Sequence, residues 1–172
     1  GNSSKNSSLI IEDCDAEGNL IDLFSGGICG YRVGGDGSII TIKETSFVGE
    51  LNEKSGGICG ARFGNLTHSN QNSNIKIVNC NVDCSNAING TFLSGGGIVG
   101  YKSLCGFKPT NSENVNLNKA IIHGCRFTGD IAGGCGGIIG PESGELSNIT
   151  ISNSHVEGDI SGGQSAGGGI CG

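Results

Sequence analysis

A short pattern of residues recurs five times along the chain with the same offsets, and this repetition constrains the fold more than any other feature. The pattern is I-x-I-x-x-C-x-F-x-G-x-I, followed by a spacer and then by G-G-I-x-G. The five copies span residues 8–30, 38–60, 73–100, 119–140 and 147–172. A chain of this kind is predicted to stack one structural unit on the next, as solenoid proteins do.

The apolar spacing inside each copy predicts short β-strands. Ile40 and Ile42 are two residues apart with a polar residue between them, which is the period of a strand rather than of a helix. The longer step to Phe47 requires a bend, and Gly residues at the corners permit positive φ angles. One copy provides about three short strands, which are too few to offset their own conformational entropy. Each copy is therefore expected to depend on its neighbours for stability.

These observations predict an all-β fold, namely a right-handed parallel β-helix of about five rungs with three short strands per rung. Stacking in register places like residues above one another at about 4.8 Å per rung. A β-sandwich or β-propeller is the competing interpretation, but the constant offsets favour coils over antiparallel hairpins. The expected core consists of two inward-facing isoleucine columns: Ile11, Ile42, Ile77, Ile122 and Ile151, and Ile28, Ile58, Ile98, Ile138 and Ile170.

The third copy is longer than the others, and the additional residues are predicted to form loop insertions at 81–92 and 103–119. The chain contains no Met, so we interpret it as a single β-helix segment of a longer repeat protein. Neither terminal copy carries a polar cap over its strand edges. Since open edges invite strand pairing, further copies or another protomer are expected to continue the stack.

The charge of the chain argues against two classes of partner. The formal net charge is -6, and only ten residues are Lys or Arg. Binding to nucleic acid or to an anionic membrane surface depends on clustered basic residues, whereas these are scattered along the sequence. No apolar run is long enough to span a bilayer. We therefore expect neither nucleic-acid binding nor a membrane span within this segment.

The nine cysteines fall into two groups. Six occupy repeat columns, where we interpret them as small buried hydrophobic side chains: Cys14, Cys80, Cys125, Cys29, Cys59 and Cys171. Stacked Cys29 and Cys59 would be near bonding range, although a bridge there would be strained. Cys84, Cys105 and Cys135 lie outside the columns, near the lengthened copy, and are the disulfide candidates. A Cys84–Cys105 bridge is the preferred pairing because it would shorten the excursion of the loop.

Five N-glycosylation sequons are present, at Asn2, Asn6, Asn65, Asn89 and Asn148. Asn148 precedes the inward Ile149 and should therefore point outward, while Asn65 and Asn89 fall in predicted turns. Together with the cysteine content, the sequons favour a secreted or cell-surface protein.

The acidic residues do not form a recognisable catalytic set. Glycoside cleavage requires carboxylates that converge on one groove, whereas Asp36, Asp83, Asp130 and Asp159 belong to different copies or offsets. Only Asp130 and Asp159 share a column. The segment Asp13-x-Asp15-x-Glu17 resembles a calcium loop, but the repeat itself explains its alternation. We therefore expect no catalysis, no metal site and no cofactor.

The chain resembles two families of surface-protein repeats. Gly97-Ile98-Val99-Gly100 and Ile77-Val78-Asn79-Cys80 are similar to the motifs of GLUG-type repeats of bacterial and protist surface proteins. The copies also look like the Gly-Gly-Ala-Ile repeats of polymorphic outer-membrane autotransporters. This resemblance implies a right-handed β-helix that serves adhesion or surface architecture, and it implies no catalytic residues.

Two functional hypotheses follow from the sequence. The first is a structural repeat segment of an extracellular or cell-surface fibre, coat or adhesin, without catalysis. Its partners would be further copies of the repeat, surface glycans, or host or matrix proteins. The alternative is a carbohydrate-binding or polysaccharide-cleaving β-helix that uses the lengthened third copy as a groove wall and depends on Asp83 or Asp130.

Overall fold

The computed structural model describes residues 6–67, 71–85, 95–108, 117–161 and 167–172, and every regular element within them is a β-strand. The ten strands are β1 (Ser8–Glu12), β2 (Asp15–Glu17), β3 (Ile39–Lys43), β4 (Ser46–Val48), β5 (Asn74–Val78), β6 (Asn81–Asp83), β7 (Asn118–His123), β8 (Arg126–Thr128), β9 (Ser147–Ser152) and β10 (His155–Glu157).

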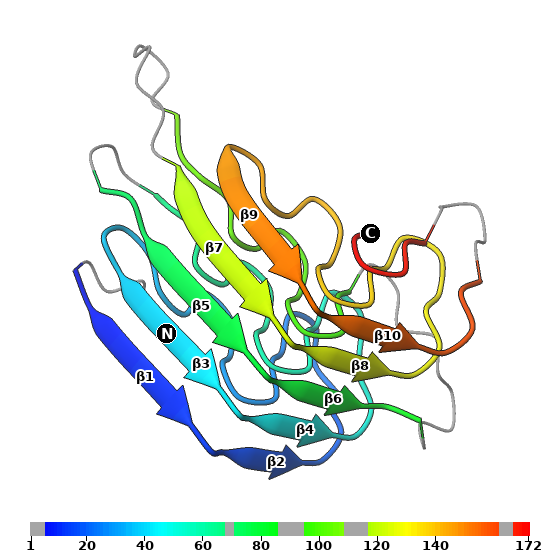
Figure 1. Ribbon diagram of the computed structural model, residues 1–172. Helices are drawn as coiled ribbons and strands as arrows, with labels where there is room; N and C mark the ends of the chain where they lie inside the picture. The colour runs from blue at the N-terminus through cyan, green and yellow to red at the C-terminus, as the bar shows by residue number, and fades with distance from the viewer. Residues whose placement is uncertain (1–5, 68–70, 86–94, 109–116, 162–166) are drawn as a thin grey trace.

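The strands form two five-stranded parallel sheets that share a corner (Figure 1). The odd-numbered strands lie in the order β1-β3-β5-β7-β9, and the even-numbered strands lie beside them in the order β10-β8-β6-β4-β2. Each copy of the repeat therefore contributes one strand to each sheet. The predicted all-β class and parallel solenoid are confirmed.

The third side of the solenoid differs from the prediction of a third strand in each rung. Each Gly-Gly-Ile segment has two isolated bridge residues separated by two bends, as in the pairs Gly26↔Gly56 and Cys29↔Cys59. The amides of Ile28 and Cys29 both donate to the carbonyl of Ile58, at 3.2 and 2.8 Å. An extended strand cannot direct two successive amides to one acceptor, because its amides alternate in direction. The segment is consequently a tight arch.

The expected core columns lie in register inside the solenoid. In the first column, Ile11, Ile42, Ile77, Ile122 and Ile151 are direct strand partners. The six central members of the two columns have no exposed surface: Ile42, Ile77, Ile122, Ile58, Ile98 and Ile138. The members in the outermost rungs are only partly covered, and Ile170 is 36% exposed rather than buried. Ile170 departs from the prediction because the described chain places no rung beyond it.

The paired glycines allow the arch to pack directly against the second sheet. A Cβ atom on Gly97 would lie 2.3 Å from the Phe127 ring and 2.1 Å from the carbonyl oxygen of Gly137. A Cβ atom on Gly57 would lie 2.5 Å from the side chain of Val82. No side chain fits at either position, so the arch backbone packs directly against the side chains of the second sheet. This explains why Gly-Gly recurs in every copy.

The loop insertions are shorter than the sequence analysis predicted. Asn81–Asp83 forms β6, and the Cys84 amide donates to the carbonyl of Thr128 at 2.7 Å. The first insertion therefore begins after Cys84. The second prediction, 103–119, includes stacked residues at its start and the beginning of β7 at its end. The remaining parts of both insertions, 86–94 and 109–116, lie outside the described residues.

Replacing Gly97 with Ala is expected to destabilise the fold by about 1–3 kcal/mol, because the new methyl group overlaps the Phe127 ring and a neighbouring carbonyl. Gly30→Ala is the matched control, since a Cβ atom there would meet nothing within 4 Å. Urea denaturation of both variants measures the difference. Equal free energies of unfolding would contradict the account of the arch.

Candidate functional site

A groove with a volume of about 780 Å³ runs along the third side of the solenoid, where the chain leaves each arch. Its lining contains three basic residues, two acidic residues and several small residues. The lining residues are Arg32, Gly34, Arg62, Asn65, Leu66, Thr67, Lys102, Cys105, Gly106, Glu142, Ser143, Gly144 and Glu145.

The charged side chains of the groove come from one position in successive copies. Arg32, Arg62, Lys102 and Glu142 each stand two residues after the final Gly of the arch motif. The backbone amides of Arg32, Arg62 and Lys102 donate to the carbonyls of Ala61, Tyr101 and Pro141, at 3.2, 2.9 and 3.1 Å. Each acceptor directly precedes the next charged residue of the series, so the four charged residues form one column. Each adopts a left-handed conformation, with φ of 56, 55, 50 and 53°. These angles turn the chain out of the arch.

The sequence analysis missed this column because it ended the repeat at the final Gly of G-G-I-x-G. The signal was nevertheless present, since the next two residues read Tyr31-Arg32, Ala61-Arg62 and Tyr101-Lys102 in the first three copies. The fourth copy continues with Pro and Glu instead, which obscures the pattern.

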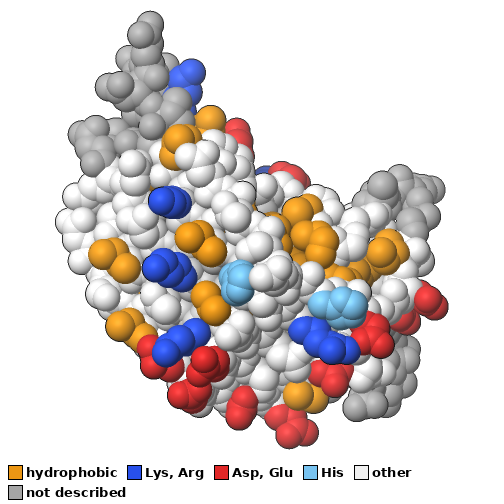
Figure 2. All heavy atoms as spheres, in the orientation of Figure 1, with side chains coloured by type: hydrophobic (Ala, Val, Ile, Leu, Met, Phe, Trp, Pro, Cys, Tyr) orange, Lys and Arg blue, Asp and Glu red, His pale blue; other side chains and the backbone are white. Residues whose placement is uncertain are grey.

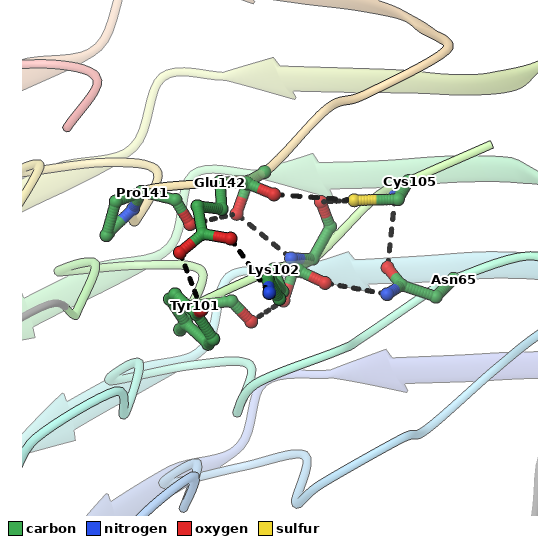
Figure 3. A network of polar contacts seen from close by, with 8 residues as sticks. Asn65, Tyr101, Lys102, Cys105, Pro141 and Glu142 are labelled. Carbon is green, nitrogen blue, oxygen red and sulfur yellow. Dashed lines mark hydrogen bonds and ion pairs between the residues drawn. The ribbon is translucent and has the colours of Figure 1, made fainter.

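An ion pair and a hydrogen bond hold Glu142 in the upper part of the column, where upper denotes the rungs nearer the C-terminus (Figure 3). The Lys102 Nζ lies 2.8 Å from a carboxylate oxygen of Glu142, and the Tyr101 hydroxyl donates to the other oxygen at 2.6 Å. These two hydrogen bonds, first that from Lys102, lower the pKa of Glu142. Conversely, the hydrogen bond to Glu142 raises the pKa of Lys102.

Asn65 ties neighbouring rungs together beneath the groove (Figure 3). Its Nδ2 donates to the carbonyl of Lys102 at 2.6 Å, and its Oδ1 accepts the amide of Cys105 at 3.0 Å. The Cys105 thiol in turn donates to the carbonyl of Glu142, with Sγ and O 3.6 Å apart. The amide group of this predicted sequon is therefore engaged within the fold.

Arg32 and Arg62 have no ion pair and no side-chain hydrogen bond within the described part of the chain. Arg32 is exposed and its guanidinium carbon lies 5.1 Å from the centre of the Tyr31 ring. Arg62 is half-buried. The lower part of the groove thus carries two positive charges that no described side chain neutralises, in a chain whose net charge is -6.

Two further sequons, at Asn6 and Asn148, fall within the described residues and do not line the groove. Asn148 is exposed on β9, pointing outward as predicted, and Asn6 is exposed in a turn. Asn2 and Asn89 lie outside the described residues. Occupancy of the five sequons stays a prediction.

All nine cysteines are free thiols in this structure. Cys84 lines a small hollow beside Asp130, Cys105 lines the groove, and Cys135 is fully buried. The structure therefore contains no Cys84–Cys105 bridge, and that pairing stays a prediction. Cys29 and Cys59 are stacked partners in adjacent rungs, as the repeat predicted, and both are buried.

Burial and neighbouring groups affect the column thiols in opposite directions. Burial is the main cause that raises the pKa of Cys59. A hydrogen bond from the Cys125 thiol and a second from Thr45 outweigh burial at Cys80 and lower its pKa to about 6. Cys80 is nevertheless only 1% exposed. The Cys80 thiol therefore has no access to reagents in the folded chain.

We expect short treatment of the native protein with iodoacetamide to label the exposed Cys14 and Cys171 and to spare the buried Cys59, Cys80 and Cys135. Denatured protein, in which all nine react, is the control. Peptide mass spectrometry measures the labelling of each site. Rapid labelling of Cys80 in the native state would show that the corner between β5 and β6 is open rather than packed.

The acidic side chains considered for catalysis accept hydrogen bonds from backbone amides of the solenoid. Asp83 accepts the amide of Ser85 at 2.9 Å, and its hydrogen bonds with Ser85 lower its pKa, which favours the ionised form. Asp130 accepts the amide of Asp159 at 3.0 Å, so the shared column of these two residues links neighbouring rungs. Among the described residues, no group of three or more His, Cys, Asp or Glu side chains is arranged to hold a metal ion.

We expect Lys102→Met to raise the pKa of Glu142 toward its ordinary value, because the ion pair is lost. The pKa of Glu142 is lower in the folded chain than in the unfolded chain. The ion pair therefore stabilises the fold fully at a pH above the unfolded pKa of Glu142, and this stabilisation is lost as the pH falls through the folded pKa. A carboxyl ¹³C NMR titration measures the change. Lys76→Met, on the outer face of β5, is the control and should leave the titration of Glu142 unaltered.

Comparison of the chain with known family models, curated proteins and solved structures finds no match. The described residues include no helix long and apolar enough to cross a membrane.

Proposed function

We propose that this chain is a structural repeat segment of an extracellular or cell-surface fibre, coat or adhesin, and that it assembles with further repeats of its own kind. The proposal includes a right-handed solenoid of about five rungs, because parallel strands joined by crossovers strongly favour that hand. It assigns the chain no catalysis. The resemblance to GLUG-type and polymorphic outer-membrane repeats agrees with such a role and remains part of the proposal.

The observation that carries this proposal is that the core is open at both ends of the described stack. β1 and β2 pair with the rest of their sheets along one edge only, as do β9 and β10. At the upper end Ile160 is 52% exposed, and at the lower end the inward Leu9 and Ile11 are only partly covered. Unpaired backbone groups and apolar side chains lie together at each end, which is the arrangement that strand addition satisfies.

The two ends also match each other. Extending the observed register by one rung would place Leu9 of a second copy over Ile149, and Ile11 over Ile151. In the arch column, Ile28 of the second copy would lie over Ile170. These are the same pairings that form the core within one copy. A head-to-tail contact of this kind does not close on itself, so it leads to a filament.

The outer faces of the two sheets are poorer association surfaces. Their hydrophobic side chains appear as separate spots among Lys, Arg and His (Figure 2). Acidic side chains gather along the edge formed by β1 and β2 (Figure 2), where Glu12, Asp13, Asp15 and Glu17 are exposed. In the head-to-tail register Glu17 would lie over Glu157. Since like charges repel, added salt should strengthen the association.

The expected result in sedimentation velocity is association of the wild-type chain that increases with protein and salt concentration. Ile160→Lys should weaken it at least tenfold, because the charge would be buried at the contact. Ile39→Lys is the matched control: Ile39 is similarly exposed, at 57% against 52% for Ile160, but it lies on the outer face of β3. Filaments in negative-stain images would accompany the association.

Two results would refute this part of the proposal. One is a monomer at every accessible concentration and salt condition. The other is equal association of the Ile160→Lys and Ile39→Lys variants, which would place the contact away from the open end.

The carbohydrate-binding alternative has support from a different place than the sequence analysis suggested. Asp83 and Asp130 line only small hollows, of about 300 and 180 Å³. The larger groove lies on the third side, and it has the size and polarity of a ligand site. No arrangement of the described acids favours cleavage.

A further inference from the structure

The groove on the third side is lined by two arginines of one column, neither of which has an ion pair within the described part of the chain. Arg32 and Arg62 occupy the same column in adjacent rungs, which are about 4.8 Å apart in a parallel stack. Like charges in neighbouring positions of a sheet repel and destabilise it. Apart from the contact of Arg32 with the Tyr31 ring, no interaction among the described residues offsets this repulsion, so the placement of two arginines in one column requires another explanation.

In the strand columns, Lys43 and Arg126 lie near acidic residues of the adjacent rungs. Lys43 lies 3.3 Å from Glu12 of the rung below, and Arg126 pairs with Glu157 of the rung above. Within the strand columns, no Lys or Arg is a direct partner of another Lys or Arg. Arg32 over Arg62 therefore departs from the arrangement of Lys and Arg in the strand columns. Such departures are typical of binding sites.

The shape of the groove suits a small polar ligand. Its volume of about 780 Å³ lies within the usual range for ligand sites. Gly34, Gly106 and Gly144 line it without side chains, and Ser143 adds only a hydroxyl group. Aromatic and large aliphatic side chains are scarce in the lining. A ligand held here would be recognised by charge and hydrogen bonds rather than by apolar contact.

The charges within the groove are arranged asymmetrically. Arg32 and Arg62 lie at the lower rungs, whereas Glu142 and the exposed Glu145 lie at the upper rung. Lys102 neutralises Glu142 but leaves Glu145 with no ion pair in the described chain. A uniformly charged polymer such as nucleic acid would bring phosphates against Glu145. A ligand with one anionic group and neighbouring hydroxyl groups fits both ends.

We propose that this groove binds an acidic oligosaccharide, with a carboxylate or sulfate group held between Arg32 and Arg62. The guanidinium group presents N–H donors in a planar fork that matches the oxygens of such a group. Hydroxyl groups of the adjoining sugar donate to Glu145. The choice of a sugar as the carrier of the anion rests on the proposed cell-surface role, whereas the anion site itself rests on the two arginines.

The test is isothermal titration calorimetry at low salt with a hyaluronan tetrasaccharide, whose carboxylates are separated by hydroxyl groups, and a heparin tetrasaccharide, whose additional sulfates would meet Glu145 and should weaken its binding relative to hyaluronan. Neutral chitotetraose is the ligand control. Arg32→Gln and Arg62→Gln should each weaken binding of the acidic sugars about tenfold or more, the effect of losing one charge-assisted hydrogen bond. Arg126→Gln removes the same charge from β8 and should leave binding unchanged. Chitotetraose should not bind.

Several outcomes would overturn the proposal: no binding of either acidic sugar by the wild-type chain, equal binding by the Arg32→Gln and Arg126→Gln variants, or binding of a DNA duplex or a phosphopeptide in place of the sugars. Arg32 is exposed, so its variant should retain the wild-type thermal midpoint and report on binding alone. Sedimentation of the same variants separates the two proposals. A variant that loses sugar binding but still self-associates is altered in the groove alone. A variant that loses self-association but still binds the sugar is altered at the open ends alone.

Discussion

The packing of paired glycines against the second sheet is the contact on which the rest of the structure depends. Gly27 lies against Phe47 of the next rung, and Gly97 lies against Phe127 of the next rung, with no room for a Cβ atom at either glycine. The arch backbone can therefore approach the sheet closely enough for one layer of side chains to fill the interior. A bulkier residue would hold the arch away and leave unfilled space, which packed protein interiors do not tolerate.

This thin interior makes each rung dependent on the rungs above and below it. The backbone hydrogen bonds of both sheets run from one rung to the next, since all the strand pairs are parallel and lie in different copies. Ile42, Ile77 and Ile122 are completely covered because each has a neighbour on both sides. In such a one-dimensional array, stability is a sum of contacts between neighbours, and the outermost rungs are the weakest.

The sequence predicted the elements that depend on periodicity, and it predicted less well those that depend on local backbone geometry. The register of Ile42 with Ile77 followed from the constant offsets alone. The third strand was wrong because a single inward Ile between glycines is compatible with a strand and with an arch. Only the two amides that share the Ile58 carbonyl distinguish them. The insertion boundary was also misplaced, because Cys84 occupies a position that is Gly in the other copies.

The sequence analysis did not predict the groove, because its charges converge only when the rungs are stacked and the repeat is aligned beyond the final Gly of G-G-I-x-G. Arg32, Arg62 and Lys102 are separated by thirty and then forty residues, so the basic residues appear scattered along the chain. The spacer of the third copy accounts for the longer second interval. Charge density in a solenoid is therefore a property of columns, and it becomes visible only after the repeat has been aligned.

In the groove column, the fold determines the backbone conformation but not the charge of the side chain. Arg32, Arg62, Lys102 and Glu142 have nearly the same φ angle, between 50 and 56°, although their charges and shapes differ. The backbone at this corner thus accepts basic and acidic residues alike. Inward columns are restricted to side chains that fill the core, and strand columns place Lys or Arg near Glu in adjacent rungs. At the corner neither restriction applies, so the fold does not require two arginines in adjacent rungs, and the proposed anion site is one reason for their presence there.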